Sequence, residues 1–204
     1  MGAEAIVEAV SGGRVARGTG LTPIDGFSAY GGSQRAVIEP LAEAVGAWPL
    51  MGAGVSLLSG PGEAAVIRDI GARPGSAGDR AIATVDQAPR RVTLSHYDPA
   101  RDYQAGVQVA TRPGAGHRDA MIELPAALSA GAAKQLAEGA LARADRQRER
   151  RMVLAGWSAL ALAPGARVRI AGEPGLWRVT DWNLEAMALR LGLTRGASAP
   201  LPGG

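Results

Sequence analysis

The strongest structural pattern in the chain is in residues 166–194, which read ARVRIAGEPGLWRVTDWNLEAMALRLGLT. Three runs in it alternate apolar with polar or small residues, and their apolar members are Val168 and Ile170, Trp177 and Val179, then Met187, Leu189, Leu191 and Leu193. Such alternation predicts strands with one buried face. The short turn at Gly172–Gly175 indicates that neighbouring strands run antiparallel. The end of the chain is therefore predicted to form a small antiparallel β-barrel.

Two segments upstream have the period of helices. Residues 129–150 are predicted as a long helix capped by Ser129. Its apolar stripe consists of Ala132, Leu136, Ala140 and Ala144, flanked by Ala133, Ala137 and Leu141. Residues 33–48 are predicted as a shorter helix that begins with Ser33 as its cap. Pro40 either kinks this helix or marks a new start, and Trp48 is the last residue of its apolar stripe.

The remaining apolar runs predict short strands at 55–58, 65–68, 82–85, 92–96, 103–109 and 121–124. In the run 103–109, Tyr103, Ala105, Val107 and Val109 share one face. The predicted fold class is α+β: a mixed helix-and-strand part, then a long helix and a small antiparallel β-barrel. The predicted division has four parts: an N-terminal segment, 1–20, that is a strand, a helical turn or a linker; a mixed part, 21–118; the helix and barrel, 119–196; and a disordered tail, 197–204.

Composition excludes several classes of protein. With 204 residues, 47% of them hydrophobic, the chain can build a real core and is not disordered throughout. The absence of cysteine excludes disulfide scaffolds, thiol catalysis and cysteine-ligated metal sites. No apolar run has transmembrane length, and residues 1–6 lack the features of a signal peptide. No membrane insertion of this segment is expected.

The positive charge is interpreted as a bias of composition. A net charge of +3 and a pI near 9.9 can indicate a nucleic-acid partner. However, Lys134 is the one lysine, and arginine, alanine, glycine and proline are all abundant, as a GC-rich genome would encode. The basic run between Arg143 and Arg151 is interpreted as the solvated end of the long helix.

No motif in the sequence carries catalytic spacing. His96 alternates with apolar residues and is predicted to be a hydrogen-bonded core or interface histidine, and His117 lies in a glycine-rich loop without a nucleophile nearby. Asp98 and Asp102 are interpreted as residues of a solvated turn. The glycine pairs at 52–54 and 114–116 are interpreted as turns, because they lack the spacing of phosphate-binding loops. We therefore expect no catalytic, cofactor-binding or metal-binding residues and no enzyme activity.

The four tryptophans could in principle form a platform that stacks on sugars. Trp48 and Trp177 occupy apolar stripes of a predicted helix and a predicted strand. Core packing is therefore expected for those two. For Trp157 and Trp182 the sequence leaves the question open.

The order of several short motifs resembles a family of viral tail proteins. The motifs, in sequence order, are Asp25–Ser28 (DGFS), Gly32–Leu41 (GSQRAVIEPL), Gly54–Leu58 (GVSLL), Val92–Pro99 (VTLSHYDP), Asp102–Val107 (DYQAGV), Ile122–Leu128 (IELPAAL), Leu162–Ile170 (LAPGARVRI) and Gly175–Thr180 (GLWRVT). This succession, over roughly residues 25–195, is similar to the tail-tip proteins of long-tailed bacteriophages and of alphaproteobacterial gene transfer agents. In that family they are baseplate hub or host-specificity proteins. Ala166 stands where the family usually has an acidic residue after Pro-Gly.

The resemblance implies a structural protein of the virion. It implies a trimeric, tail-tube-like hub around the tail channel, which docks other tail proteins, lets DNA pass transiently and is assembled in the bacterial cytoplasm. Family members are usually much longer, so the chain is expected to be a fragment. Two alternatives from other classes stay open: a tail-associated cell-wall hydrolase, which needs paired carboxylates or a histidine in one cleft, and a small-ligand-binding β-barrel module.

Overall fold

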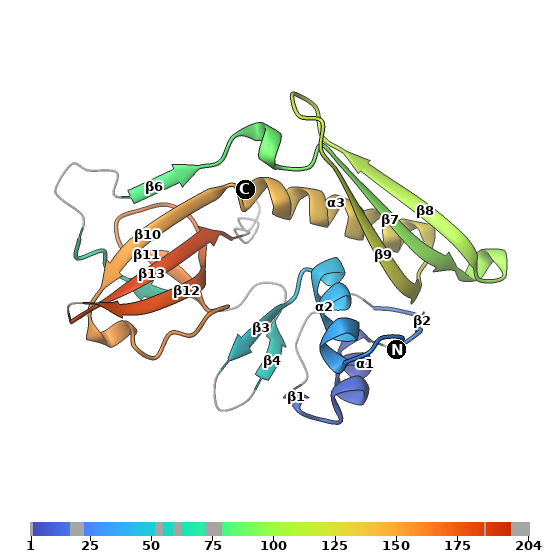
Figure 1. Cartoon of the computed structure of the whole chain (residues 1–204), viewed down its shortest axis with the longest axis horizontal. Helices are drawn as coiled ribbons and strands as arrows, with labels where there is room; N and C mark the ends of the chain where they lie inside the picture. Colours follow the sequence, from blue (N-terminus) through green and yellow to red (C-terminus); the bar gives the residue numbers. More distant parts are fainter. Residues whose placement is uncertain are drawn as a thin grey trace, which may run out of the picture. The chain divides into compact units, whose positions relative to one another are not determined.

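The computed structural model describes residues 2–16, 23–51, 55–58, 63–71, 79–185 and 187–196. In these ranges it has three α-helices and three sheets (Figure 1). The chain forms two compact units, each assembled from separate stretches. The first comprises residues 1–49, 53–60 and 85–145, and the second 50–52, 61–84 and 146–204. The division at residue 118 stays a prediction.

The first unit is built on a four-stranded sheet in the order β2-β9-β7-β8. Its strands are β2 (Gly26–Phe27), β7 (Arg91–Asp98), β8 (Gln104–Thr111) and β9 (Asp119–Ala127). β7 lies antiparallel to β8 and parallel to β9. β9 is longer than its predicted core, because it continues through Pro125 to pair with β2.

Three helices bury the inner face of this sheet. They are α1 (Ala3–Ser11), α2 (Gln34–Val45) and α3 (Ala130–Arg146). The core that they share with the sheet contains Ile6, Val7, Leu41, Val45, Val92, Leu94, Leu124, Leu128, Leu136 and Leu141. Ser33 and Ser129 cap α2 and α3 as predicted, because each Oγ accepts a backbone N–H three residues ahead at 3.2 Å. Residues 3–11 form a helix, where the sequence left a strand, a helical turn or a linker open.

Three details of the predicted helices are corrected. α3 ends at Arg146 rather than 150, because the next residues form β10 (Glu149–Ala155), whose alternate side chains are buried. The buried stripe of α3 is centred on Ala133, Ala137 and Leu141, about one position from the predicted stripe. Trp48 is outside α2 and begins β3 (Trp48–Met51), which belongs to a three-stranded sheet with β1 (Val15–Ala16) and β4 (Val55–Leu58) in the order β1-β4-β3.

The second unit contains a six-stranded sheet in the order β5-β11-β12-β13-β10-β6. Besides β10, its strands are β5 (Ala65–Ile67), β6 (Asp79–Ile82), β11 (Arg167–Ile170), β12 (Trp177–Glu185) and β13 (Ala188–Arg195). The predicted antiparallel strands are present, but the closed β-barrel is wrong. The sheet curls into a half-barrel whose end strands, β5 and β6, do not pair with each other.

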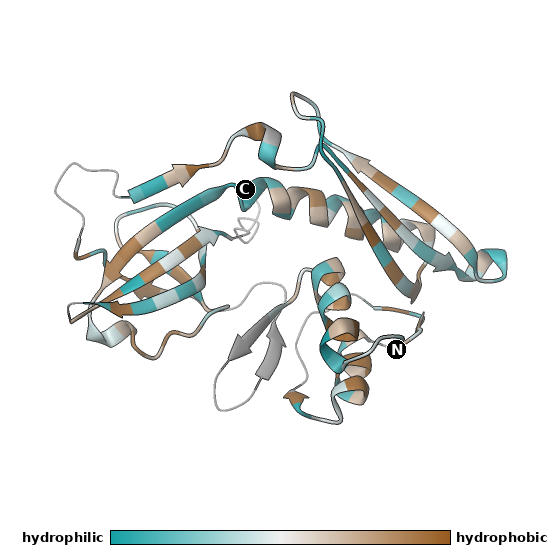
Figure 2. Ribbon diagram, in the orientation of Figure 1, coloured by the Kyte–Doolittle hydropathy of each residue, from teal (hydrophilic) through white to brown (hydrophobic). Residues whose placement is uncertain are grey.

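The core of the half-barrel comes from the predicted alternation. Val168, Ile170, Trp177, Val179, Leu189, Leu191 and Leu193 are all buried, together with Ile67, Val153 and Ala155. Figure 2 shows the change from hydrophilic to hydrophobic residues along β10. Met187 departs from the pattern, because it lies in the turn between β12 and β13 with a positive φ of 64° and an exposed side chain. The predicted tail, 197–204, lies outside the described residues.

Candidate interaction surfaces

Strand β8 forms an edge of the four-stranded sheet, and no other described strand pairs with its outer side. Arg112 donates its N–H to the Arg90 carbonyl (3.0 Å), so a hydrogen bond joins this pair of opposite residues. In an antiparallel ladder, such pairs alternate with pairs that form no hydrogen bond to each other, and this bond therefore shows which pairs of β7 and β8 are which. By that alternation, the backbone groups of Ala105, Val107, Val109 and Thr111 point away from β7. We call these four residues the β8 edge.

One group of the β8 edge already has a partner. Lys134, on α3, donates from Nζ to the carbonyl oxygen of Val109. A lysine beside an edge strand is a common means of limiting unwanted strand pairing. The arrangement restricts addition of another strand to the part of β8 nearer Ala105 and Val107.

The outer face of the same sheet is rich in exposed apolar side chains. Tyr97 of β7, Val107 and Val109 of β8 and Met121 of β9 are 44%, 56%, 37% and 67% exposed. Val109 and Met121 flank Thr93 in the register, so these strands present one continuous face. The prediction that Ala105, Val107 and Val109 share a face is confirmed, and that face is exposed. Tyr103 precedes β8 and adopts a positive φ of 59°.

In the second unit, other strands of the chain cover both edges of the sheet that residues 166–194 form. β5 pairs in parallel with β11, and β10 pairs antiparallel with β13. The edges left on this sheet belong to β5 and β6. All four residues of β6 are exposed, and Arg80 there pairs with Glu149 of β10 at 2.6 Å.

Exposed aromatic and apolar residues gather at one end of the half-barrel. Trp182 and Leu184 lie opposite the buried Leu191 and Leu189, so they continue the core face of the sheet. They are nevertheless 44% and 47% exposed. Trp177 is buried in the core as predicted, with the Arg195 guanidinium 5.1 Å from its ring centroid.

A buried ion cluster holds the second unit together. Arg151 on β10 is only 2% exposed and contacts the carboxylates of Asp69 (3.4 Å) and Glu173 (2.5 Å). Asp69 also accepts the N–H groups of Gly71 (3.1 Å) and Leu154 (3.3 Å). The cluster thereby joins the segment after β5, strand β10 and the turn between β11 and β12.

The basic run is therefore not a solvated helix end. Besides the buried Arg151, Arg143 of α3 donates to the last carbonyls of α2, at Glu43 (2.6 Å) and Ala44 (3.2 Å). Arg148 donates to the Ala83 carbonyl at 3.1 Å. Elsewhere, burial lowers the pKa of the Arg167 guanidinium. Arg143, Arg148 and Arg151 of this run thus donate hydrogen bonds to carbonyls or pair with carboxylates of their own unit.

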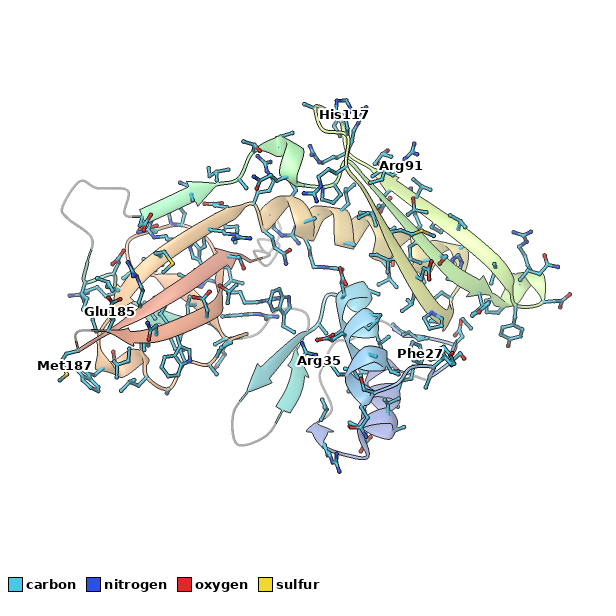
Figure 3. The ribbon with its side chains drawn as sticks, in the orientation of Figure 1. Phe27, Arg35, Arg91, His117, Glu185 and Met187 are labelled. Carbon is cyan, nitrogen blue, oxygen red and sulfur yellow. The ribbon has the colours of Figure 1, made fainter. Side chains whose placement is uncertain are left out.

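The histidines occupy separate places. His96 is buried as predicted, at 3% exposure, but its two ring nitrogens have no hydrogen-bond partner among the described residues. Its ring lies over Gly106, where a Cβ would stand 2.7 Å from His96 Cε1. His117 is exposed at the end of the sheet, beside Arg91 (Figure 3).

The predicted turn at Asp98 and Asp102 is confirmed, but it is solvated only at Asp102, because Asp98 is 8% exposed. Asp98 Oδ1 accepts the N–H of Ala100 at 3.0 Å, and Asp102 has a positive φ of 53°. Among the described residues, no group of three or more histidine, aspartate or glutamate side chains is arranged to hold a metal ion. In the same part of the chain, no helix is both long and apolar enough to cross a membrane.

Proteins similar to this chain are found in one sequence family and among solved structures. No curated protein matches the sequence. A chain in the virion of a native gene transfer agent particle has a similar structure, with a TM-score of 0.81, 20% identity and coverage of 100% of this chain and 50% of that one. Our chain thus spans about half the length of that chain.

Two tail proteins have the same fold at lower similarity. The tail protein from Neisseria meningitidis MC58 matches with a TM-score of 0.62 and 14% identity, over 96% of this chain and 67% of that one. The 43 kDa tail protein of prophage MuSo2 from Shewanella oneidensis matches with a TM-score of 0.53 and 11% identity, over 95% and 65%.

The sequence itself decides the family. The model of the family described as "Putative phage tail protein" matches residues 33–182, well over half of the chain. This range contains α2, the outer sheet face, α3 and most of the half-barrel. The family is one of tail proteins rather than of enzymes. The chain therefore belongs to the phage tail protein family.

Proposed function

We propose that this chain is a structural part of the baseplate hub, at the tail tip of a phage or gene transfer agent particle. Family membership and the fold shared with a chain of a gene transfer agent virion support this role. The hub would surround the tail channel and dock other tail proteins, with DNA passing only transiently. It would be assembled in the bacterial cytoplasm and then reside in the virion.

The observation that carries the proposal is the combination of the β8 edge with the outer sheet face. Val107 has both an outward-pointing backbone and a side chain that is 56% exposed. A strand added to β8 would satisfy its backbone groups and extend the sheet. If the added strand comes from a different patch of the neighbouring copy, repetition of this contact by a rotation that closes gives a ring.

The stability of such an assembly depends on how much surface each copy buries. A single interface below ~1,000 Å² is usually weak or transient. We therefore expect this chain alone to be a monomer or a weak oligomer, and a longer parent protein to be a trimer. The apolar end of the half-barrel, with Trp182, Leu184 and Met187 exposed, is the surface we assign to other tail proteins.

Val107→Lys tests the role of the β8 edge. A charge there should prevent strand addition without opening the sheet, because this backbone makes no bond to β7. Ile70→Lys is the matched control, since Ile70 is 57% exposed and lies outside the strands. Sedimentation velocity of the longer parent protein over increasing concentration should show association of the unaltered protein and of Ile70→Lys, and its loss in Val107→Lys.

Purified particles from the source bacterium provide the second readout. Cryo-electron microscopy of their tails should place the parent protein at the tail tip in three copies. Absence of the protein from particles, or association of Val107→Lys equal to that of the unaltered protein, would contradict the proposal. The hydrolase alternative makes the opposite prediction: release of peptidoglycan fragments by the purified chain.

A further inference from the structure

A basic hollow lies at one end of the four-stranded sheet, where β7 begins, β8 ends and β9 begins. It has a volume of about 590 Å³, and its lining includes Arg90, Arg91, Thr111, Arg112, His117 and Asp119. Figure 3 shows Arg91 and His117 together at this end of the sheet. By register, its lining residues Arg91, Thr111 and Asp119 continue the outer sheet face, but none of the exposed apolar side chains of that face lines the hollow.

Three neighbouring strand ends each contribute an arginine. Arg90 donates its N–H to the Arg118 carbonyl at 2.8 Å, and Arg112 donates its N–H to the Arg90 carbonyl at 3.0 Å. Arg118, Arg90 and Arg112 are thus consecutive across the sheet. Since adjacent strands lie ~4.8 Å apart, the three backbones span roughly 10 Å.

Two of these arginines are held in place by neutral acceptors. Arg112 donates from Nε to the carbonyl of Pro89 (3.1 Å) and from Nη2 to those of Val85 (3.0 Å) and Ala88 (3.3 Å). Arg118 donates from Nη1 to the carbonyl of Gln87 at 3.1 Å. Carbonyl partners fix both guanidinium groups without cancelling their charge. Arg112 lines the hollow, and Arg118 lies in the chain between the lining residues His117 and Asp119, so part of the positive charge is held in place before any ligand arrives.

The remaining charges do not balance this excess. Arg90 and Arg91 are exposed, and no ion pair of either is found in the described part of the chain. Asp119 is the single carboxylate among the residues that line the hollow. Arginine stays charged at every physiological pH, and its planar donors suit phosphate oxygens.

We propose that the basic hollow binds backbone phosphates of double-stranded DNA without reading its sequence. Two fixed guanidinium groups, Arg112 and Arg118, beside the exposed Arg90 and Arg91 suit a ligand with repeated charges better than a single carboxylate. The lining contains no Phe, Tyr or Trp on which unpaired bases could stack, which favours a duplex over a single strand. The proposed DNA contact goes beyond the proposed hub role, and neither of the two proposals depends on the other.

Binding of a fluorescent 20-base-pair duplex, followed by anisotropy from 50 to 200 mM salt, tests the proposal. The chain should bind at 50 mM salt and lose affinity steeply as salt rises. The double variant Arg90→Gln/Arg91→Gln should lower affinity at least tenfold. It should also reduce the slope of log affinity against log salt by about 1.8, since each lost phosphate contact removes ~0.9.

The matched control is Arg14→Gln/Arg101→Gln, which removes the same charge from exposed arginines of the same unit. This control should bind nearly as well as the unaltered protein. Equal loss in both variants would assign the binding to net charge and overturn the proposal, as would no binding at 50 mM salt. Tighter binding of poly-glutamate than of the duplex would overturn it as well. Val107→Lys should bind DNA normally, so failure here leaves the test of self-association intact.

Discussion

Replacement of Arg151 by methionine tests whether the buried ion cluster holds the second unit together. Arg151 and Asp69 are 2% and 7% exposed at their side chains, so solvent screens their attraction little. Removing one partner of such a pair costs ~3–5 kcal/mol, because the other charge stays buried and unpaired. The orphaned Asp69 keeps the N–H groups of Gly71 and Leu154, and Glu173 is 34% exposed. We therefore expect a loss near the lower limit, about 3 kcal/mol.

Urea unfolding followed by tryptophan fluorescence is the appropriate assay. Trp157, Trp177 and Trp182 all belong to the second unit, so the signal reports mainly its unfolding. The midpoint should fall in Arg151→Met while the slope m stays constant. Adding Asp69→Asn to this variant should recover part of the lost stability, because it removes the unpaired charge.

The control for this experiment is Arg169→Met. Arg169 is exposed on strand β11 of the same sheet, so the change should stay within ~0.5 kcal/mol. A loss below about 1 kcal/mol in Arg151→Met would refute the reasoning, since it lies far under the cost of breaking a buried pair. Strictly additive effects of Arg151→Met and Asp69→Asn would refute the coupling of these two residues.

Three further predictions concern the first unit. Leu136→Ala, at a buried position of α3, should cost ~2–5 kcal/mol in urea unfolding, whereas Gln135→Ala at an exposed position should change it by less than ~0.5 kcal/mol. Arg143→Ala should cost ~1–3 kcal/mol by leaving carbonyls at the end of α2 without their charged donor, and circular dichroism should show earlier melting of helix. Gly106→Ala should cost ~1–3 kcal/mol because its Cβ would overlap the ring of His96, and His96→Ala in the same chain should relieve part of that cost.

Local patterns predicted most of the elements. The caps Ser33 and Ser129 marked the starts of α2 and α3, because a hydroxyl that accepts the N–H three residues ahead is a short-range interaction. The alternation at Val168–Ile170 and Leu189–Leu193 predicted the buried face of the half-barrel. The order of motifs placed the chain among tail proteins, and the family match confirms it.

The tertiary structure decided which strands are neighbours. β5 inserts beside β11 from about a hundred residues away, and β10 joins β13, so the predicted barrel is an open half-barrel. The sequence placed the end of α3 too late, because arginines such as Arg150 and Arg151 are as typical of a solvated helix end as of a strand such as β10. Burial of Arg151 depends on Asp69 and Glu173, which reach it from distant segments.

The candidate surfaces show the same division between local and long-range information. The period of two correctly grouped Ala105, Val107 and Val109, yet no local signal says whether another layer covers their face. Likewise, the row of Arg118, Arg90 and Arg112 exists only because three strand ends meet. A side-chain period reports the direction in which residues point, and it is set by the backbone of one segment. Strand order and the clustering of charges are set by pairing between segments far apart in sequence, which only the folded chain specifies.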